Sequence, residues 1–142
     1  MLERYMPVSN FSALLRQISL KNHLAVDALK EGTATIDDVQ NLSELHNFVD
    51  RLMSIGFGME YKDVLFAGRE AILAIAERTP QNAKNFAALE AEVTALAEMI
   101  DLHDAQTEVI TLQDVRRAEE FCQKNGKLVN ISFGTAPQAT AE

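Results

Sequence analysis

The chain of 142 residues has one cysteine, three prolines, six glycines and no tryptophan. The single cysteine, Cys122, excludes an internal disulfide, and no Cys-x-x-Cys pair or Cys/His cluster is present to bind zinc. The scarcity of proline and glycine, together with a hydrophobic content of 47%, excludes collagenous, low-complexity and intrinsically disordered chains. We therefore expect a globular protein that folds without a disulfide or a structural metal.

The sequence also lacks a long apolar run and an excess of positive charge. No run approaches the length of about 20 residues that a membrane-spanning helix needs. Near the N-terminus, Glu3, Arg4 and Pro7 interrupt the apolar core that a secretory signal requires. The chain has 13 Lys and Arg residues and 21 Asp and Glu residues, and its net charge of −8 disfavours binding to nucleic acid. These absences predict a cytoplasmic protein that binds neither membranes nor nucleic acid.

Apolar residues recur at spacings of three and four along most of the chain, which is the periodicity of amphipathic helices. This spacing predicts helices over residues 10–31, from the Thr35 cap to the Gly56 stop, over 60–78 and over 82–109. Thr111 begins a further capping pattern, so residues 82–124 form either one kinked helix or two. Each helix has one apolar face to bury, and the sequence therefore predicts an all-α bundle of four to five helices.

The predicted bundle forms one domain over residues 1–133. The Asn125-Gly126 pair is expected to end the last helix, because a glycine readily adopts the left-handed conformation of a helix stop. Residues 128–133 are expected to form a short extended segment, and residues 134–142 a flexible C-terminal tail.

The clearest apolar stripe lies on the predicted fourth helix. Its members alternate spacings of three and four: Phe86, Leu89, Val93, Leu96, Ile100 and His103. A stripe of this kind packs either inside the bundle or against a second copy of the chain. A homodimer through Leu89, Val93, Leu96 and Ile100 is therefore as well supported by the sequence as a monomer.

The same helix is rich in acidic residues. Between Lys84 and Arg116 the chain has no basic residue, whereas seven Asp and Glu residues occur there. Five of those outside the apolar stripe form what we call the acidic face: Glu90, Glu98, Asp101, Asp104 and Glu108. One interpretation of the acidic face is a solvated surface that keeps the protein soluble. The other is a docking surface for a basic protein partner, where complementary charge accelerates encounter.

The three histidines are the remaining candidates for chemistry. On the helical wheel His23 points to solvent, whereas His46 and His103 lie at the edges of their apolar stripes. No Glu-x-x-His motif, phosphate loop or nucleophile motif is present, and Cys122 lies on an apolar stripe. We therefore predict no cofactor, metal site, catalytic residue or enzyme activity. The competing interpretation is a bundle that binds a metal or a small ligand, with His46 and His103 at its mouth.

Four segments carry a resemblance to known proteins: residues 19–25 (SLKNHLA), 56–61 (GFGMEY), 74–78 (AIAER) and 102–106 (LHDAQ). They are similar to small uncharacterised helical proteins encoded by proteobacterial phages, plasmids and integrated elements. The resemblance implies no activity and no functional residue. It implies a mobile-element context, in which accessory proteins often bind other proteins.

Composition and resemblance together lead to an expectation about function. We expect a non-enzymatic accessory or regulatory protein that acts through protein–protein contacts. A self-associating structural subunit is a further alternative, since the stripe on the fourth helix is suited to pairing with a second copy.

Overall fold

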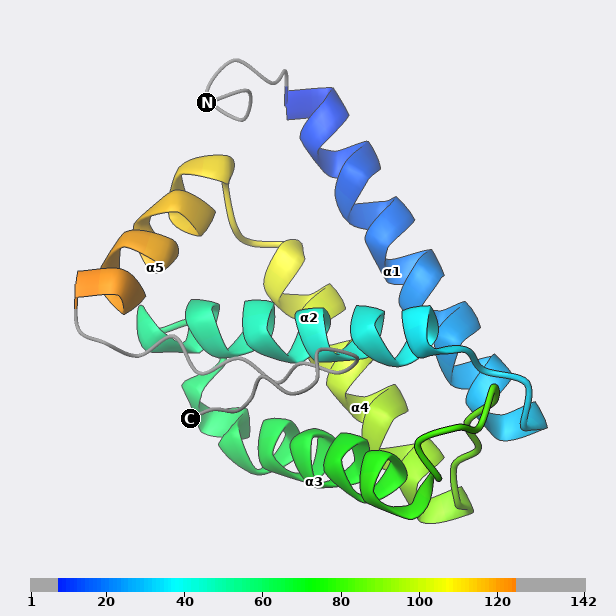
Figure 1. The fold of residues 1–142 in the computed structure, drawn as a ribbon. Helices are drawn as coiled ribbons and strands as arrows, with labels where there is room; N and C mark the ends of the chain where they lie inside the picture. The colour runs from blue at the N-terminus through cyan, green and yellow to red at the C-terminus, as the bar shows by residue number, and fades with distance from the viewer. Residues whose placement is uncertain (1–7, 125–142) are drawn as a thin grey trace.

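The computed structural model describes residues 8–124, which form five α-helices and no β-strand (Figure 1). The helices are α1 (Val8–Glu31), α2 (Ile36–Ser54), α3 (Lys62–Arg78), α4 (Glu90–Thr107) and α5 (Leu112–Lys124). A short 3-10 turn, η2 (Met59–Tyr61), precedes α3. The prediction of an all-α bundle is confirmed.

Helices α1 to α4 enclose the main core. In Figure 1, α2 and α3 run antiparallel, and α4 packs on both of them and on α1. The core contains side chains from all four helices that are at most 1% exposed, including Leu29, Leu42, Ile72, Leu96 and Ile100. Burying a side chain of this size contributes about 1.5–3 kcal/mol, so these contacts dominate the stability of the bundle.

Helix α5 forms a smaller cluster at the C-terminal end of α2. Ile110 and Ala118 pack there on Leu52, with Phe48 and Val115 at the border of the cluster. Cys122 is 1% exposed, as its apolar stripe predicts, and its thiol donates to Ser54 Oγ over 3.5 Å. α5 is therefore attached to the bundle mainly through α2.

Several predicted helix boundaries are confirmed by their capping contacts. The Thr35 backbone N–H donates to Asp38 Oδ2 over 2.9 Å at the start of α2, and Gly56 has a φ of +104° just after its end. At the start of α5, the Thr111 N–H donates to Asp114 Oδ2, also over 2.9 Å. Because this cap opens a new helix after the break that follows Thr107, residues 82–124 contain two helices rather than one kinked helix.

The predicted start of the fourth helix is wrong. α4 begins at Glu90 instead of residue 82, and the preceding segment hydrogen-bonds to the turn between α1 and α2. Phe86 N–H donates to Ala34 O over 2.8 Å, and Ala88 N–H donates to Leu29 O over 3.0 Å. These long-range bonds satisfy the backbone in an extended form, so the segment does not need helical hydrogen bonds.

Three predicted features lie outside the described residues: the helix stop at Asn125-Gly126, the extended segment 128–133 and the tail 134–142. Among the helices of residues 8–124, none combines the length and apolar character that crossing a lipid bilayer requires.

Candidate functional site

Four members of the acidic face point to solvent, as predicted. Glu90, Glu98, Asp101 and Glu108 are exposed, and none makes an ion pair within residues 8–124. α4 itself contains no Lys or Arg. These four carboxylates therefore project from one helix without a neutralising partner.

Glu92, another acid of α4 that was not assigned to the acidic face, is partly buried and paired within the fold. Glu92 accepts two hydrogen bonds from the Arg78 guanidinium, at 2.7 and 2.9 Å, and a third from the Leu89 N–H. The Arg78 hydrogen bonds lower the pKa of the Glu92 carboxyl below its ordinary value. Since Arg78 is the last residue of α3, this pair joins the end of α3 to the beginning of α4.

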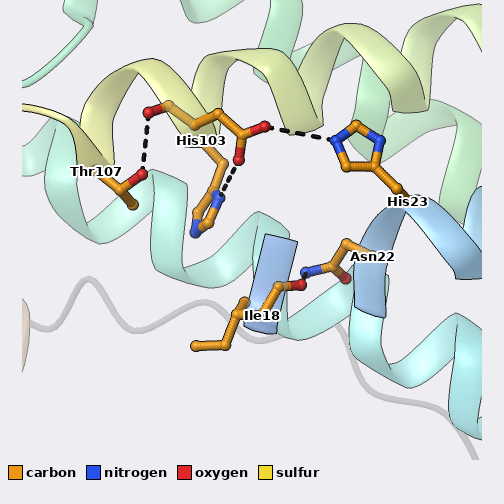
Figure 2. Close-up of polar contacts among 6 residues, drawn as sticks. Ile18, Asn22, His23, His103 and Thr107 are labelled. Atoms are coloured by element: carbon orange, nitrogen blue, oxygen red, sulfur yellow. Dashed lines mark hydrogen bonds and ion pairs between the residues drawn. The ribbon is translucent and has the colours of Figure 1, made fainter. Parts of the chain in front are cut away.

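Asp104 differs from the other members of the acidic face because its carboxylate lies between two histidines. Its Oδ1 is 3.3 Å from His103 Nδ1, and its Oδ2 is 3.5 Å from His23 Nε2 (Figure 2). Thr107 donates to the Asp104 carbonyl oxygen over 2.9 Å. The Asp104 side chain is 36% exposed, and it connects α4 to α1.

His103 lies much deeper than the boundary position predicted for it. It is 1% exposed, and its ring packs at 5.5 Å, centroid to centroid, from Phe48 of α2. Burial lowers the pKa of the imidazole, although the hydrogen bond with Asp104 opposes the shift. The ring is thus neutral at pH 7, and the Asp104 carboxylate keeps the proton on Nδ1. Nε2 is then a hydrogen-bond acceptor, and Figure 2 shows it pointing away from Asp104.

His46 is also fully buried, so its predicted position at the edge of the apolar stripe is wrong. Its Nδ1 is 2.9 Å from Asn47 Oδ1, and its Nε2 accepts a hydrogen bond of 2.9 Å from Arg69 Nε. Burial is the main reason that the pKa of His46 is lowered, with the Arg69 charge acting in the same direction. Because α3 brings Arg69 over the ring, both nitrogens are satisfied within the protein and His46 is not at the mouth of any site.

Beside His103, a cavity of about 440 Å³ opens between α1 and α2. Asn22 of α1 also lines it and is 2% exposed. Its Nδ2 donates to the Ile18 carbonyl over 2.8 Å, whereas its Oδ1 is enclosed and has no hydrogen-bond partner (Figure 2). The cavity is therefore lined by Asn22, whose Oδ1 is buried without a hydrogen-bond partner, and by His103, whose Nε2 makes no hydrogen bond to a described residue.

A second hollow, of about 490 Å³, separates the N-terminal half of α1 from the C-terminal end of α4. Asp104 and Glu108 line one side of it, and Arg16 of α1 lines the other. Arg16 therefore lies near Asp104 and Glu108. The negative charge of the acidic face is reduced least at Glu90, Glu98 and Asp101.

The residues proposed for a homodimer differ in how deeply they are buried. Leu96 and Ile100 are fully buried in the main core of the same chain, Val93 is half-buried and Leu89 is 59% exposed. Pairing through all four residues would require the bundle to open, which would expose the core between α3 and α4. Homodimerisation through this helix stays a prediction.

No group of three or more His, Cys, Asp or Glu side chains within residues 8–124 has the arrangement to hold a metal ion. His23, which is exposed as predicted, and His103 approach one carboxylate, while His46 is bonded elsewhere. The described residues that line the cavity beside His103 include no Ser, Thr or Cys. Its apolar walls and the Asn22 and His103 side chains are suited to binding.

Sequence reasoning missed Asn22 and the link from Asp104 to the histidines. The contact between His23 and Asp104 joins residues 81 positions apart, which no local pattern reveals. One signal was present: at 100° per residue, Asp104 lies about 80° from Leu96, closer to the buried side than any other member of the acidic face.

Comparisons with protein-family models, with curated proteins and with solved structures gave no match. The resemblance to proteins of mobile elements therefore stays a prediction.

Proposed function

We propose that this chain is a non-enzymatic accessory protein that binds a basic protein partner through the acidic face of α4. The observation that carries the proposal is the set of exposed carboxylates, Glu90, Glu98, Asp101 and Glu108, which make no ion pair within residues 8–124. Solubility alone does not require a helix with acids and no bases, because exposed helices commonly alternate acidic residues with Lys or Arg.

The physical basis is complementary charge. A row of carboxylates produces a negative potential that attracts a basic surface over roughly 10 Å at moderate salt. Attraction of this kind accelerates encounter and makes binding sensitive to salt. Repulsion from phosphates supports a protein partner over nucleic acid. The sequence resemblance supports a role alongside other proteins of a mobile element.

The test is capture of partners from a host lysate by three forms of the chain. The first is the wild type, and the second carries Glu98→Lys, Asp101→Lys and Glu108→Lys on the acidic face. The third is a matched control with Asp63→Lys, Glu70→Lys and Glu77→Lys, which makes the same change of net charge on exposed positions of α3. Circular dichroism should show equal helix content in all three.

We expect the wild type and the α3 control to retain the same partner at about 50 mM salt, and the α4 variant to lose it. Raising the salt to about 500 mM should release the partner from both binding forms, because added ions screen exposed charges. A partner retained by all three forms, or lost equally from both variants, would contradict a role for this particular face.

A further inference from the structure

The cavity between α1 and α2 has the properties of a small-molecule site. Its volume of about 440 Å³ falls within the range of about 300–1,000 Å³ that is typical of ligand pockets. Most of its wall is apolar and is formed by Leu14 and Ile18 of α1 and by Leu45 and Phe48 of α2. These walls would remove the body of a small organic molecule from water.

The inner end of the cavity presents hydrogen-bond acceptors without donors. Asn22 Oδ1 is enclosed and unpartnered, because Asn22 is oriented by its Nδ2 bond to the Ile18 carbonyl. His103 Nε2 is the second acceptor, since Asp104 holds the ring proton on Nδ1. Buried polar atoms in folded proteins normally have partners, so an enclosed acceptor without one at the end of a cavity calls for a ligand that donates.

Two further features narrow the chemistry of the ligand. The rings of Phe48 and His103 are inclined at 59° and form an aromatic corner, against which a flat ring can pack. At the mouth, Lys21 contributes a positive charge and Glu44 a negative charge, and Arg51 is engaged in an interaction of its own. An anionic group on the outer end of the molecule would face Lys21.

We propose that this cavity binds a small aromatic acid whose ring carries a hydroxyl group at the end opposite its carboxylate. The hydroxyl donates its one proton to His103 Nε2, the ring packs between Ile18 and Phe48, and the carboxylate faces Lys21. This site is separate from the acidic face of α4, and it stands or falls independently of the proposed protein partner.

The first test uses the full chain and two probes, 4-hydroxyphenylacetate and phenylacetate, which differ only in the hydroxyl group. Titrations followed by ¹H–¹⁵N NMR should show the hydroxylated probe binding with a dissociation constant of about 1 mM or lower, as expected for a compact ligand of this size. Phenylacetate should bind about five- to tenfold more weakly, because it leaves His103 Nε2 without a donor. Equal affinity for the two probes, or no binding of either up to about 10 mM, would overturn the proposal.

The second test uses variants of the cavity. His103→Phe keeps an aromatic ring but removes the acceptor, and it should abolish the preference for the hydroxylated probe. Ile18→Trp changes a half-buried wall residue and should block both probes while the circular dichroism spectrum stays unchanged. His23→Gln, an exposed histidine on the far side of Asp104, is the control and should bind like the wild type. A preference for the hydroxylated probe that survives in both cavity variants would place binding elsewhere and overturn the proposal.

Discussion

The regions around His46 and His103 look alike by burial and differ in their hydrogen bonds. Both imidazoles are at most 1% exposed, and burial lowers the pKa of each. Around His46, both ring nitrogens have partners, in Asn47 and Arg69. Around His103, Nδ1 is the one ring nitrogen with a hydrogen-bond partner among the described residues, and the nearby Asn22 Oδ1 is buried without a partner beside a cavity.

This difference shows why burial alone does not identify a binding site. A buried polar group whose partners lie inside the chain stabilises one packing arrangement, and an external ligand has nothing to add to it. A buried group that lacks a partner keeps its capacity to bind one. We therefore assign a structural role to His46 and a binding role to His103.

Replacing each histidine by leucine should give the largest contrast between the two regions. His46→Leu leaves the buried Asn47 Oδ1 and the Arg69 guanidinium without their partner, so the free energy of unfolding should fall by about 2–3 kcal/mol. His103→Leu should cost no more than about 1 kcal/mol, because the half-exposed Asp104 carboxylate can be hydrated instead. Urea unfolding at pH 7 measures both values. Equal losses would remove the distinction between the two regions.

The His46 region can also be perturbed without changing the histidine. A Cβ on Gly68 would lie 2.6 Å from Met99 Sδ, at the close contact of α3 with α4. We expect Gly68→Ala to destabilise the bundle by about 1–2 kcal/mol, since α3 and the Arg69 that it carries would be displaced. In an exposed helix the same substitution stabilises by about 1 kcal/mol. Thermal unfolding that shows a more stable variant would therefore contradict the packing described for α3 and α4.

The pH dependence of stability should come from both regions. Because burial lowers the pKa of His46 and of His103 from the ordinary 6.5, the unfolded chain binds more protons than the folded one below that pH. The free energy of unfolding should therefore be constant above about pH 7.5 and fall as the pH is lowered through 6.5.

Urea unfolding at closely spaced pH values tests this slope. Each leucine variant should reduce it, and combining the two variants should flatten the curve down to about pH 5. The carboxyls of Glu92 and Asp114, whose pKa values are lowered mainly by hydrogen bonds, act only at more acidic pH. Stability that instead rises on acidification from pH 7 would show that the buried rings are protonated in the folded state.

The smallest effect is expected at Asp104. Asp104→Asn removes a charge from the exposed contact with His23, and such contacts contribute about 0.5 kcal/mol. The amide oxygen of asparagine still accepts from His103 Nδ1, so the cavity should keep its preference for the hydroxylated probe. Unfolding at low salt and the probe titration provide the measurements. A loss above about 2 kcal/mol would mean that the carboxylate holds α1 and α4 together.

The sequence predicted helix boundaries correctly where caps and stops within a few residues determine them. It failed where hydrogen bonds to a distant part of the chain determine the boundary. The caps at Thr35 and Thr111 and the stop at Gly56 are local, and they lie where expected. The start of α4 depends on hydrogen bonds of Phe86 and Ala88 to the turn between α1 and α2. No spacing within residues 82–89 reveals those bonds.

The candidate site shows the same division. Exposure of Glu90, Glu98, Asp101 and Glu108 follows from the helical wheel alone. The burial of His46 depends on Arg69, which arrives from another helix 23 residues further along the chain. The cavity depends on how α1 crosses α2, and the amphipathic pattern of each helix constrains that crossing only weakly.

The most direct test of the contrast between the two histidines follows their ring nitrogens by ¹H–¹⁵N NMR at pH 7, with and without 4-hydroxyphenylacetate. Both rings should be neutral with the proton on Nδ1, and addition of the probe should shift His103 Nε2 while both nitrogens of His46 stay unchanged. A shift at His46 with none at His103, or a His103 ring that carries its proton on Nε2, would contradict the assignment of the binding role to His103.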